Sequence, residues 1–128
     1  MENTSKNYYE VFWDDENKIG RIFVSGEIDI ELTKKIIEGG KKIQKKHCSE
    51  NEKMKWLVNA DKVTKPVLSL RVREIMSEAI KFIGAGKIAI TGKSIIIKTV
   101  MIFIMAAAGQ KKFKYFKTEE ESLKWLKG

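Results

Sequence analysis

The chain has 128 residues, enough for one domain with an ordinary hydrophobic core and too few to divide comfortably into two. Hydrophobic residues make up 43% of it and charged residues 33%, a composition that excludes a disordered or membrane-embedded protein. The net charge of +8 comes from 22 Lys and only 3 Arg against 17 acidic residues, and diffuse lysine is typical of a solvated surface rather than of a nucleic-acid reader.

No segment marks the chain for export or for a membrane span. The start MENTSKNYYE is polar, and no apolar run reaches the roughly 18 residues that a span needs. Cys48 is the only cysteine, which excludes an intrachain disulfide and a thiolate metal cluster. We therefore expect a single cytoplasmic domain, residues 1–128, with no cofactor and no metal.

A β-hairpin and a helix come first. Residues 8–13 and 19–25 alternate apolar and polar side chains on either side of the turn DDEN. Asp29 can cap the following helix, whose apolar positions recur at helical spacing. Gly39 and Gly40 weaken this helix by about 1 kcal/mol each relative to Ala, and we expect them to let it bend or pack close to the sheet.

His47 and Cys48 follow in a lysine-rich stretch near the end of this helix. A nucleophilic pair would need the two side chains to face each other, but sequence neighbours point to different faces of a helix. Both are therefore interpreted as surface residues.

The next strand is KMKWLVNAD, residues 53–61, apolar enough in its centre to be a parallel strand covered on both sides. Asp61 ends it and organises a polar loop, KVTKP. Asp61, Thr64 and Lys65 are candidates for binding a partner. Pro66 then begins a helix with an apolar face, which Gly84 stops.

The last forty residues repeat strand and helix in order. Strands are predicted over 87–91 and 112–116 and helices over 95–108 and from Thr118, which forms a capping box with Glu121. This order indicates a parallel sheet with packed helices. The predicted fold class is therefore α/β: a mixed sheet of about five strands that opens with a β-hairpin, with four helices packed on it.

The stretch GKIAITGKS resembles a phosphate loop but lacks its first glycine, because that position is Lys87. Lys93 and Ser94 remain, either as a site for one anion at a helix N-terminus or as an ordinary helix cap, which we favour. The strand KFKYF alternates lysine with aromatic residues, as any half-buried strand does, so nucleic acid is not the expected partner.

The helix over 95–108 has almost no polar face, so both of its sides need a cover. The covers considered are a second subunit, an apolar ligand against the methionines, a membrane surface, or a larger internal core. The candidate residues for the interface or the ligand are Ile97, Met101, Phe103, Ile104 and Met105. A twofold dimer is the least demanding answer.

Nearly the whole chain resembles the SpoIIAA-like fold of the STAS domains, the anti-sigma-factor antagonist family. The similarity is closest to a small, poorly characterised bacterial branch with a hairpin, a GEID-like helix start, a WLVNAD-like strand and a terminal helix like EESLKWLKG. In phospho-switched members a serine is phosphorylated in an Asp-Ser-Ser-Gly turn at a helix start. Here Val67, Leu68, Ser69 and Leu70 occupy that place, so the motif is absent and Ser69 is the nearest candidate phosphoacceptor.

The sequence therefore predicts a non-enzymatic regulatory or protein-interaction module of STAS type that associates with itself. The alternative is a carrier or sensor of a small apolar or lipid-like ligand. An enzyme comes third, because one His and one Cys cannot supply a nucleophile, a base and an orienting group.

Overall fold

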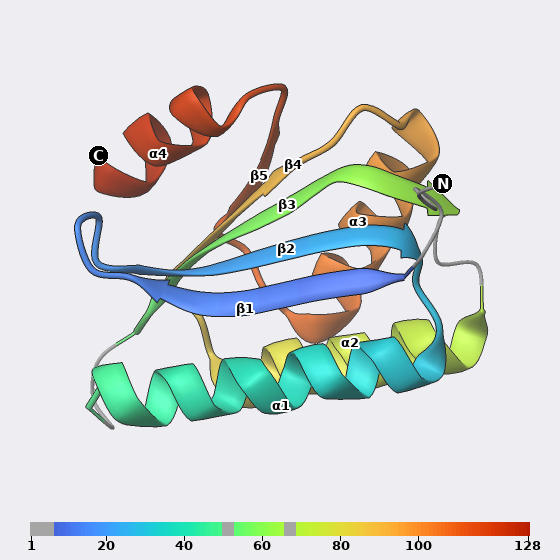
Figure 1. Ribbon diagram of the computed structural model, residues 1–128, viewed down its shortest axis with the longest axis horizontal. Coiled ribbons are helices and arrows are strands. Elements are labelled where there is room, and N and C mark those ends of the chain that lie inside the picture. Colours follow the sequence, from blue (N-terminus) through green and yellow to red (C-terminus); the bar gives the residue numbers. More distant parts are fainter. Residues whose placement is uncertain (1–6, 50–52, 66–68) are drawn as a thin grey trace, which may run out of the picture.

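One sheet with the strand order β1-β2-β3-β4-β5 organises the computed structural model, which describes residues 7–49, 53–65 and 69–128 (Figure 1). Within these residues β1 and β2 form an antiparallel hairpin, and every later strand pairs in parallel with the one before it. The strands are β1 (Tyr8–Asp14), β2 (Ile19–Glu27), β3 (Lys55–Lys65), β4 (Lys87–Thr91) and β5 (Phe113–Phe116). The helices are α1 (Ile30–His47), α2 (Leu70–Ile83), α3 (Ile95–Ala108) and α4 (Glu119–Lys127). The predicted fold class is confirmed.

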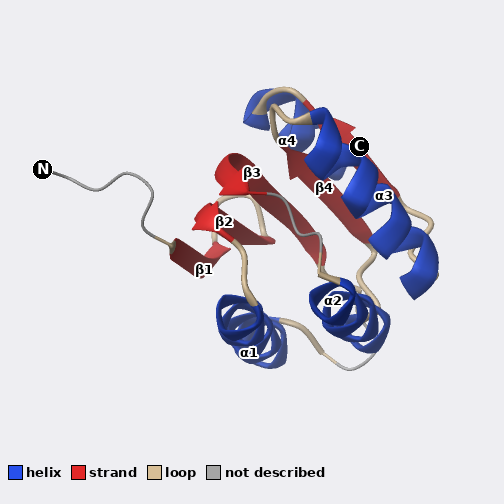
Figure 2. Cartoon of the chain, turned by 90° about the vertical axis from the view of Figure 1, so that its right-hand side faces the viewer, coloured by secondary structure: helices blue, strands red, loops and turns tan. Residues whose placement is uncertain are grey.

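The sheet is covered unequally on its two faces (Figure 2). Trp56 packs in one cluster with Met105 of α3 and with residues of α1 and α2. Its neighbour Leu57 points to the opposite face, as successive strand residues do, and packs against Leu126 of α4. Among the described residues, three helices therefore cover one face and α4 alone covers the other, because right-handed crossovers place all connecting helices of a parallel run on the same side.

The helix ends follow the predicted signals. Asp29 accepts a hydrogen bond from the Leu32 N–H at 2.8 Å, and Thr118 accepts one from the Glu121 N–H at 3.2 Å. Gly84 and Gly109 close α2 and α3 in the left-handed region, with φ of 60° and 74°. The predicted bounds of α3 and β4 agree with the observed ones.

Strand β3 is longer than predicted. The polar residues after Asp61 were expected to form a loop, but Lys62, Val63 and Lys65 pair with Ser25, Gly26 and Glu27 of β2, across two irregularities in register. Thr64 and Lys65 are therefore strand residues, because β2 supplies a main-chain partner that the composition of KVTKP does not indicate. Helix α2 begins at Leu70, and Pro66, its predicted start, lies outside the described residues.

Three glycines set the distance between the hairpin, α1 and the core. A Cβ at Gly20 would lie 2.5 Å from the Trp56 ring and from the end of Met54, and one at Gly39 would lie 3.2 Å from Val11. A Cβ at Gly40 would meet Trp56 at an ordinary 3.6 Å. The predicted close approach of α1 to the sheet is therefore present, and it is closest at Gly39.

Substituting Gly20 and Gly40 with alanine should have opposite effects on stability. Gly20→Ala should lower the free energy of unfolding by about 1–3 kcal/mol, because the methyl group overpacks Trp56. Gly40→Ala should raise it by about 0.5–1 kcal/mol, because alanine favours a helix and fits the space. Urea denaturation of both variants measures this, and a Gly20→Ala variant as stable as the wild type would contradict the packing described.

Candidate functional site

An apolar cavity of about 150 Å³ lies between the sheet and helices α1, α2 and α3. Thr33 and Trp56 are the lining residues whose side chains carry a polar atom, and the Thr33 hydroxyl already donates to the Asp29 carbonyl at 2.7 Å. The other lining residues are apolar, and three of them are methionines. They are Ile22, Val24, Ile28, Ile36, Ile37, Gly40, Val58, Ala60, Met76, Ala79, Ile80, Ile83, Ala85, Ile88, Ile90, Ile97, Val100, Met101 and Met105. Such a wall suits an apolar molecule and offers little to a polar one.

The residues of α3 that were predicted to form an interface or bind a ligand lie in three different environments. Ile97, Met101 and Met105 line the cavity. Ile104 is 1% exposed and packs with Val72 and Val100 between α2 and α3. Phe103 points outward and is 64% exposed. The helix was expected to need a cover on both sides, and among the residues that the structure describes only its inner side has one.

The outer face of α3 is an exposed apolar surface. Ile95 and Phe103 are the most exposed, at 77% and 64%, and Ile96 and Ile102 lie on the same side of the helix. Lys98 is the only charged residue of the helix. We call these four apolar residues the α3 patch. Adjacent exposed apolar side chains often mark an interaction site, whereas single scattered ones do not.

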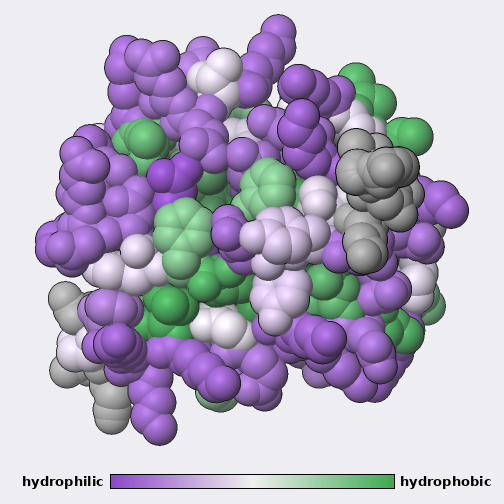
Figure 3. Space-filling model, viewed as in Figure 1, coloured by the Kyte–Doolittle hydropathy of each residue, from purple (hydrophilic) through white to green (hydrophobic). Residues whose placement is uncertain are grey.

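A second apolar region lies where α4 leaves the sheet uncovered. Tyr8 and Phe12 of β1 are exposed, Tyr8 meets Phe23 edge to face at 6.1 Å, and Arg21 lies over the Phe12 ring at 5.9 Å. Figure 3 shows green and white residues gathered in the middle of this face, with mostly purple residues around them. The hydrophilic residues on this side therefore surround a less polar centre.

The predicted hydroxyl groups at the helix starts are engaged as caps. Ser69 accepts a hydrogen bond from the Val72 N–H at 3.4 Å, and Ser94 accepts one from the Ile97 N–H at 3.3 Å. The favoured interpretation of Ser94 as a cap is thereby supported. Lys93, its neighbour, is exposed just before α3.

Asp61 lies close to Tyr115, a residue that the sequence did not single out. Burial and then the charge of Asp61 raise the pKa of the Tyr115 phenol. The Tyr115 hydroxyl and one Asp61 oxygen are buried without a hydrogen-bond partner among the described residues. Gly92 makes room for this ring, because a Cβ there would collide with the hydroxyl. Asp61 was expected to end the strand and organise a turn, but it lies within β3, where its carboxylate is close to the Tyr115 phenol.

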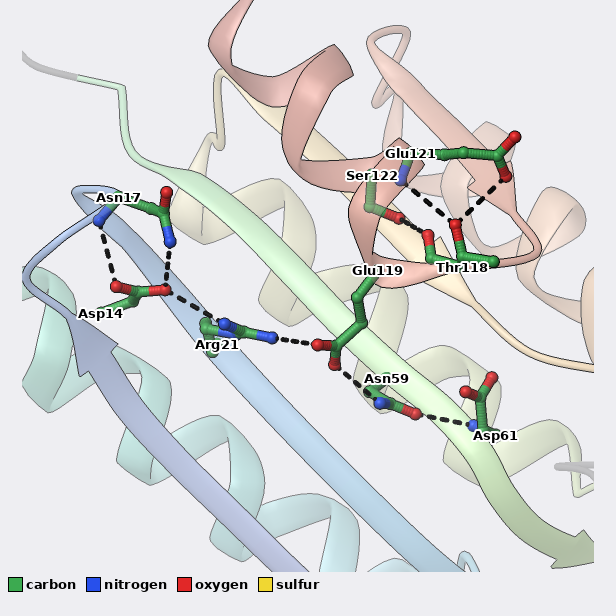
Figure 4. A network of polar contacts seen from close by, with 9 residues as sticks. All are labelled: Asp14, Asn17, Arg21, Asn59, Asp61, Thr118, Glu119, Glu121 and Ser122. Atoms are coloured by element: carbon green, nitrogen blue, oxygen red, sulfur yellow. Dashed lines mark hydrogen bonds and ion pairs between the residues drawn. The ribbon is translucent and has the colours of Figure 1, made fainter.

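A chain of polar contacts joins the hairpin to α4 (Figure 4). The Arg21 guanidinium binds Asp14 at 3.1 Å and Glu119 at 2.6 Å. The Asn59 amide donates to the second Glu119 oxygen at 2.8 Å, and Asn17 donates to Asp14 at 2.8 Å and 3.0 Å. Because each charged side chain in this row of contacts has a partner, the contacts suit anchoring of α4 to the hairpin better than acid–base chemistry.

The same contacts determine the ionisation of the two acids. Burial opposes the charged forms, but hydrogen bonds from Asn17 and Arg21 outweigh it and lower the pKa of Asp14. For Glu119 burial is again opposed by Asn59 and Arg21, and the pKa of that carboxyl is also lowered. Both acids are therefore more firmly ionised in the folded chain than in the unfolded one.

No catalytic or metal constellation forms where the structure describes the chain. His47, the only histidine, stacks on Trp13 with ring centroids 4.4 Å apart. Among the described residues no group of three or more His, Cys, Asp or Glu could hold a metal ion. None of the helices found in residues 7–49, 53–65 and 69–128 has the length and apolar character needed to cross a membrane.

Comparison with known proteins identifies the fold and the family. A family model described as SpoIIAA-like matches residues 19–127. A crystal structure of an uncharacterised protein of the DUF3478 family from Shewanella loihica PV-4, described as having a SpoIIAA-like fold, superposes with a TM-score of 0.68. The two chains are 10% identical and the match covers 98% of each. None of the curated proteins matches this sequence.

The Asp14–Arg21–Glu119 contacts predict a pH dependence of stability. A carboxyl whose pKa is lower in the folded chain stabilises it fully above the unfolded pKa, near 4, and loses that effect as the pH falls through the folded pKa. The free energy of unfolding should therefore decrease between about pH 6 and about pH 3, and by less in Glu119→Gln.

Glu120→Gln is the matched control, because Glu120 is an exposed neighbour on the same helix. Its stability should fall with pH as in the wild type. Denaturant unfolding at several pH values measures all three proteins. Equal pH dependence in Glu119→Gln and Glu120→Gln would show that the contacts of Glu119 with Arg21 and Asn59 (Figure 4) do not stabilise the fold.

Proposed function

We propose that this chain, which belongs to the SpoIIAA-like family, acts as a non-enzymatic regulatory module of STAS type that associates with itself through the α3 patch. The family match supports the regulatory class, and STAS domains commonly mediate protein interactions. The observation that carries the self-association is the exposure of Ile95, Ile96, Ile102 and Phe103 on one side of α3. The proposed location is the reducing cytoplasm, which suits a chain with a single thiol.

A second copy is the simplest occupant of the α3 patch. The patch consists of side chains without charge, so it needs no complementary partner and can pack against itself about a twofold axis. Such contact would remove apolar side chains from water, which is the main driving force of association. Because each copy carries a net charge of +8, repulsion between copies opposes the dimer and weakens as salt screens it.

A regulatory protein partner would need a different surface. We propose that it binds near the outer end of β3, where Thr64 and Lys65 are exposed beside Asp61. Within the described part of the chain, the ion pair of Lys65 is a long one with Glu27, at 3.9 Å, so we propose that Lys65 can meet an acidic partner. Ser69 caps α2 nearby in the sequence, and its hydroxyl, which accepts the capping bond from the Val72 N–H, is the candidate phosphoacceptor of this region.

A charge placed in the α3 patch should separate the dimer without unfolding the subunit. Phe103→Glu should give a folded monomer at a concentration where the wild type is dimeric, because a glutamate cannot be buried unpaired. Phe82→Glu is the matched control, since Phe82 is 75% exposed on α2, where Lys41 of α1 lies 5.0 Å from its ring. Light scattering after size exclusion and circular dichroism measure mass and folding.

Ile104→Glu should behave differently from Phe103→Glu. Its side chain is buried between α2 and α3, so the variant should unfold. A wild-type mass equal to one subunit at all concentrations and salts would overturn the self-association. A dimer that survives Phe103→Glu would place the interface elsewhere.

The cavity favours a second candidate function, a carrier or sensor of a small apolar ligand. Its volume of about 150 Å³ matches the size of an engineered apolar cavity that stays dry and binds benzene. Methionine side chains adapt to irregular shapes, and Met76, Met101 and Met105 line the space. The inner side of α3 thus supports the ligand and its outer side the dimer, so the two functions are compatible.

Filling the cavity should abolish ligand binding and stabilise the chain. Ala79→Leu places a larger side chain from α2 into the space, so the free energy of unfolding should rise by about 1 kcal/mol or more. Benzene should raise the melting temperature of the wild type and leave that of Ala79→Leu unchanged. Calorimetry with and without benzene measures both, and an unchanged wild-type melting temperature would contradict the carrier.

A further inference from the structure

Strand β1 forms a free edge of the sheet. It stands first in the strand order, so among the described residues only β2 pairs with it. Figure 2 shows β1 at one side of the sheet, with no described helix or strand beyond it. In an antiparallel pair alternate residues turn their N–H and C=O groups toward the neighbouring strand, and the others turn theirs outward. About half of the residues Tyr8–Asp14 therefore present main-chain groups that β2 does not use.

The two edges of the sheet differ in their protection against a further strand. Proteins usually blunt an edge strand by keeping it short or by placing lysine or proline in it. The edge strand β5 has four residues, one of which is Lys114, and Lys112 and Lys117 stand directly before and after it. Strand β1 has seven residues, and its sequence YYEVFWD contains neither lysine nor proline. The β1 edge is therefore open to an added strand, whereas the β5 edge is protected.

A groove of about 840 Å³ lies along this open edge, between β1 and the start of α1. Val11 packs against α1 at Gly39, and Tyr9 points to the same side, because strand residues two apart share a face. Tyr8 and Phe12 point to the other side and are 49% and 41% exposed. A strand added beside β1 would thus place one row of side chains over the start of α1 and the other row beside these two aromatic rings.

The groove carries negative charge, although the chain as a whole carries +8. Its charged lining residues are Glu10, Asp29, Glu31 and Lys35, three acids and one base, so its net charge is −2. All four side chains are exposed, and Asp29 and Glu31 lie together at the start of α1. Because physiological salt screens charges beyond about 8 Å, the acids of the groove act on a bound segment more strongly than the distant lysines do.

We infer that β1 binds an extended segment of a partner protein as an additional strand, in which lysine or arginine alternates with apolar residues. The basic side chains would lie beside Asp29 and Glu31 and the apolar ones beside Tyr8 and Phe12. A second copy fits less well, because its β1 would bring the same acids together and its β5 is too short to pair along the whole edge. The inference goes beyond the proposed function and depends on neither the α3 patch nor the cavity.

Two synthetic peptides with the length of β1 test the charge preference. One alternates valine with lysine and the other valine with glutamate. At physiological salt the wild type should bind the lysine peptide roughly tenfold more tightly, because the groove attracts one peptide and repels the other. Glu31→Lys brings the net charge of the groove to zero and should remove this preference. Glu120→Lys is the matched control, because it makes the same change at an exposed position on α4 and should keep the preference.

Amide hydrogen exchange, measured residue by residue, shows where the peptide lies. The outward N–H groups of β1 should exchange roughly tenfold more slowly when the lysine peptide saturates the protein, because each then has a main-chain acceptor. Exchange in β5 should stay unchanged. If Glu31→Lys does not fold, Glu10→Lys makes the same change of charge from within β1.

Each other outcome overturns a stated part of the inference. No slowing in β1 would overturn the added strand, and equal affinity for both peptides would overturn the basic partner. Slowing in β1 that increases with protein concentration, without any peptide, would show that a second copy occupies the edge instead. The mass of the wild type and its response to benzene test the proposed function separately, so failure of one does not mimic failure of the other.

Discussion

The burial of β3 and β4 on both faces is the constraint on which the rest of the structure depends. Leu57, Ala89 and Ile90 have no exposed surface, so each face of these two strands must be covered by helices. The parallel crossovers bring α1, α2 and α3 to one face. The other face is covered by α4, which follows β5 at the end of the chain. The small helix α4 must therefore be held firmly, and its two ends are.

At its first turn, Glu119 binds Arg21 and Asn59 from two different strands. At its last turn, the ammonium groups of Lys55 and Lys87 donate to the carbonyl oxygens of Leu126 and Trp125, at 2.6 Å and 3.0 Å. Acidic groups suit the positive end of a helix dipole and cations its negative end, so both contacts favour the same orientation. Lysines that look like diffuse surface charge in the sequence thus serve the fold.

The sequence predicts local features well and long-range ones poorly. The bounds of α3 and β4 and the caps at Asp29, Ser94 and Thr118 depend on neighbouring residues, and all are as expected. The contact of Arg21 with Glu119 joins residues 98 positions apart, and the extension of β3 to Lys65 depends on β2. The cavity depends on the summed volumes of side chains from six elements, which no local pattern contains.

The cavity also carries a cost that bears on what it does. At roughly 24 cal/mol per Å³, an empty space of about 150 Å³ costs on the order of 3–4 kcal/mol, a large share of the 5–15 kcal/mol by which domains are usually stable. Larger side chains at Ala60, Ala79 or Ala85 would remove that cost without disturbing the caps or the strand pairing. A bound molecule would offset the same cost through contacts with the walls, so that ligand and fold would stabilise each other. The outer face of α3 follows the same physics, because a second copy would bury the apolar surface that the chain leaves exposed.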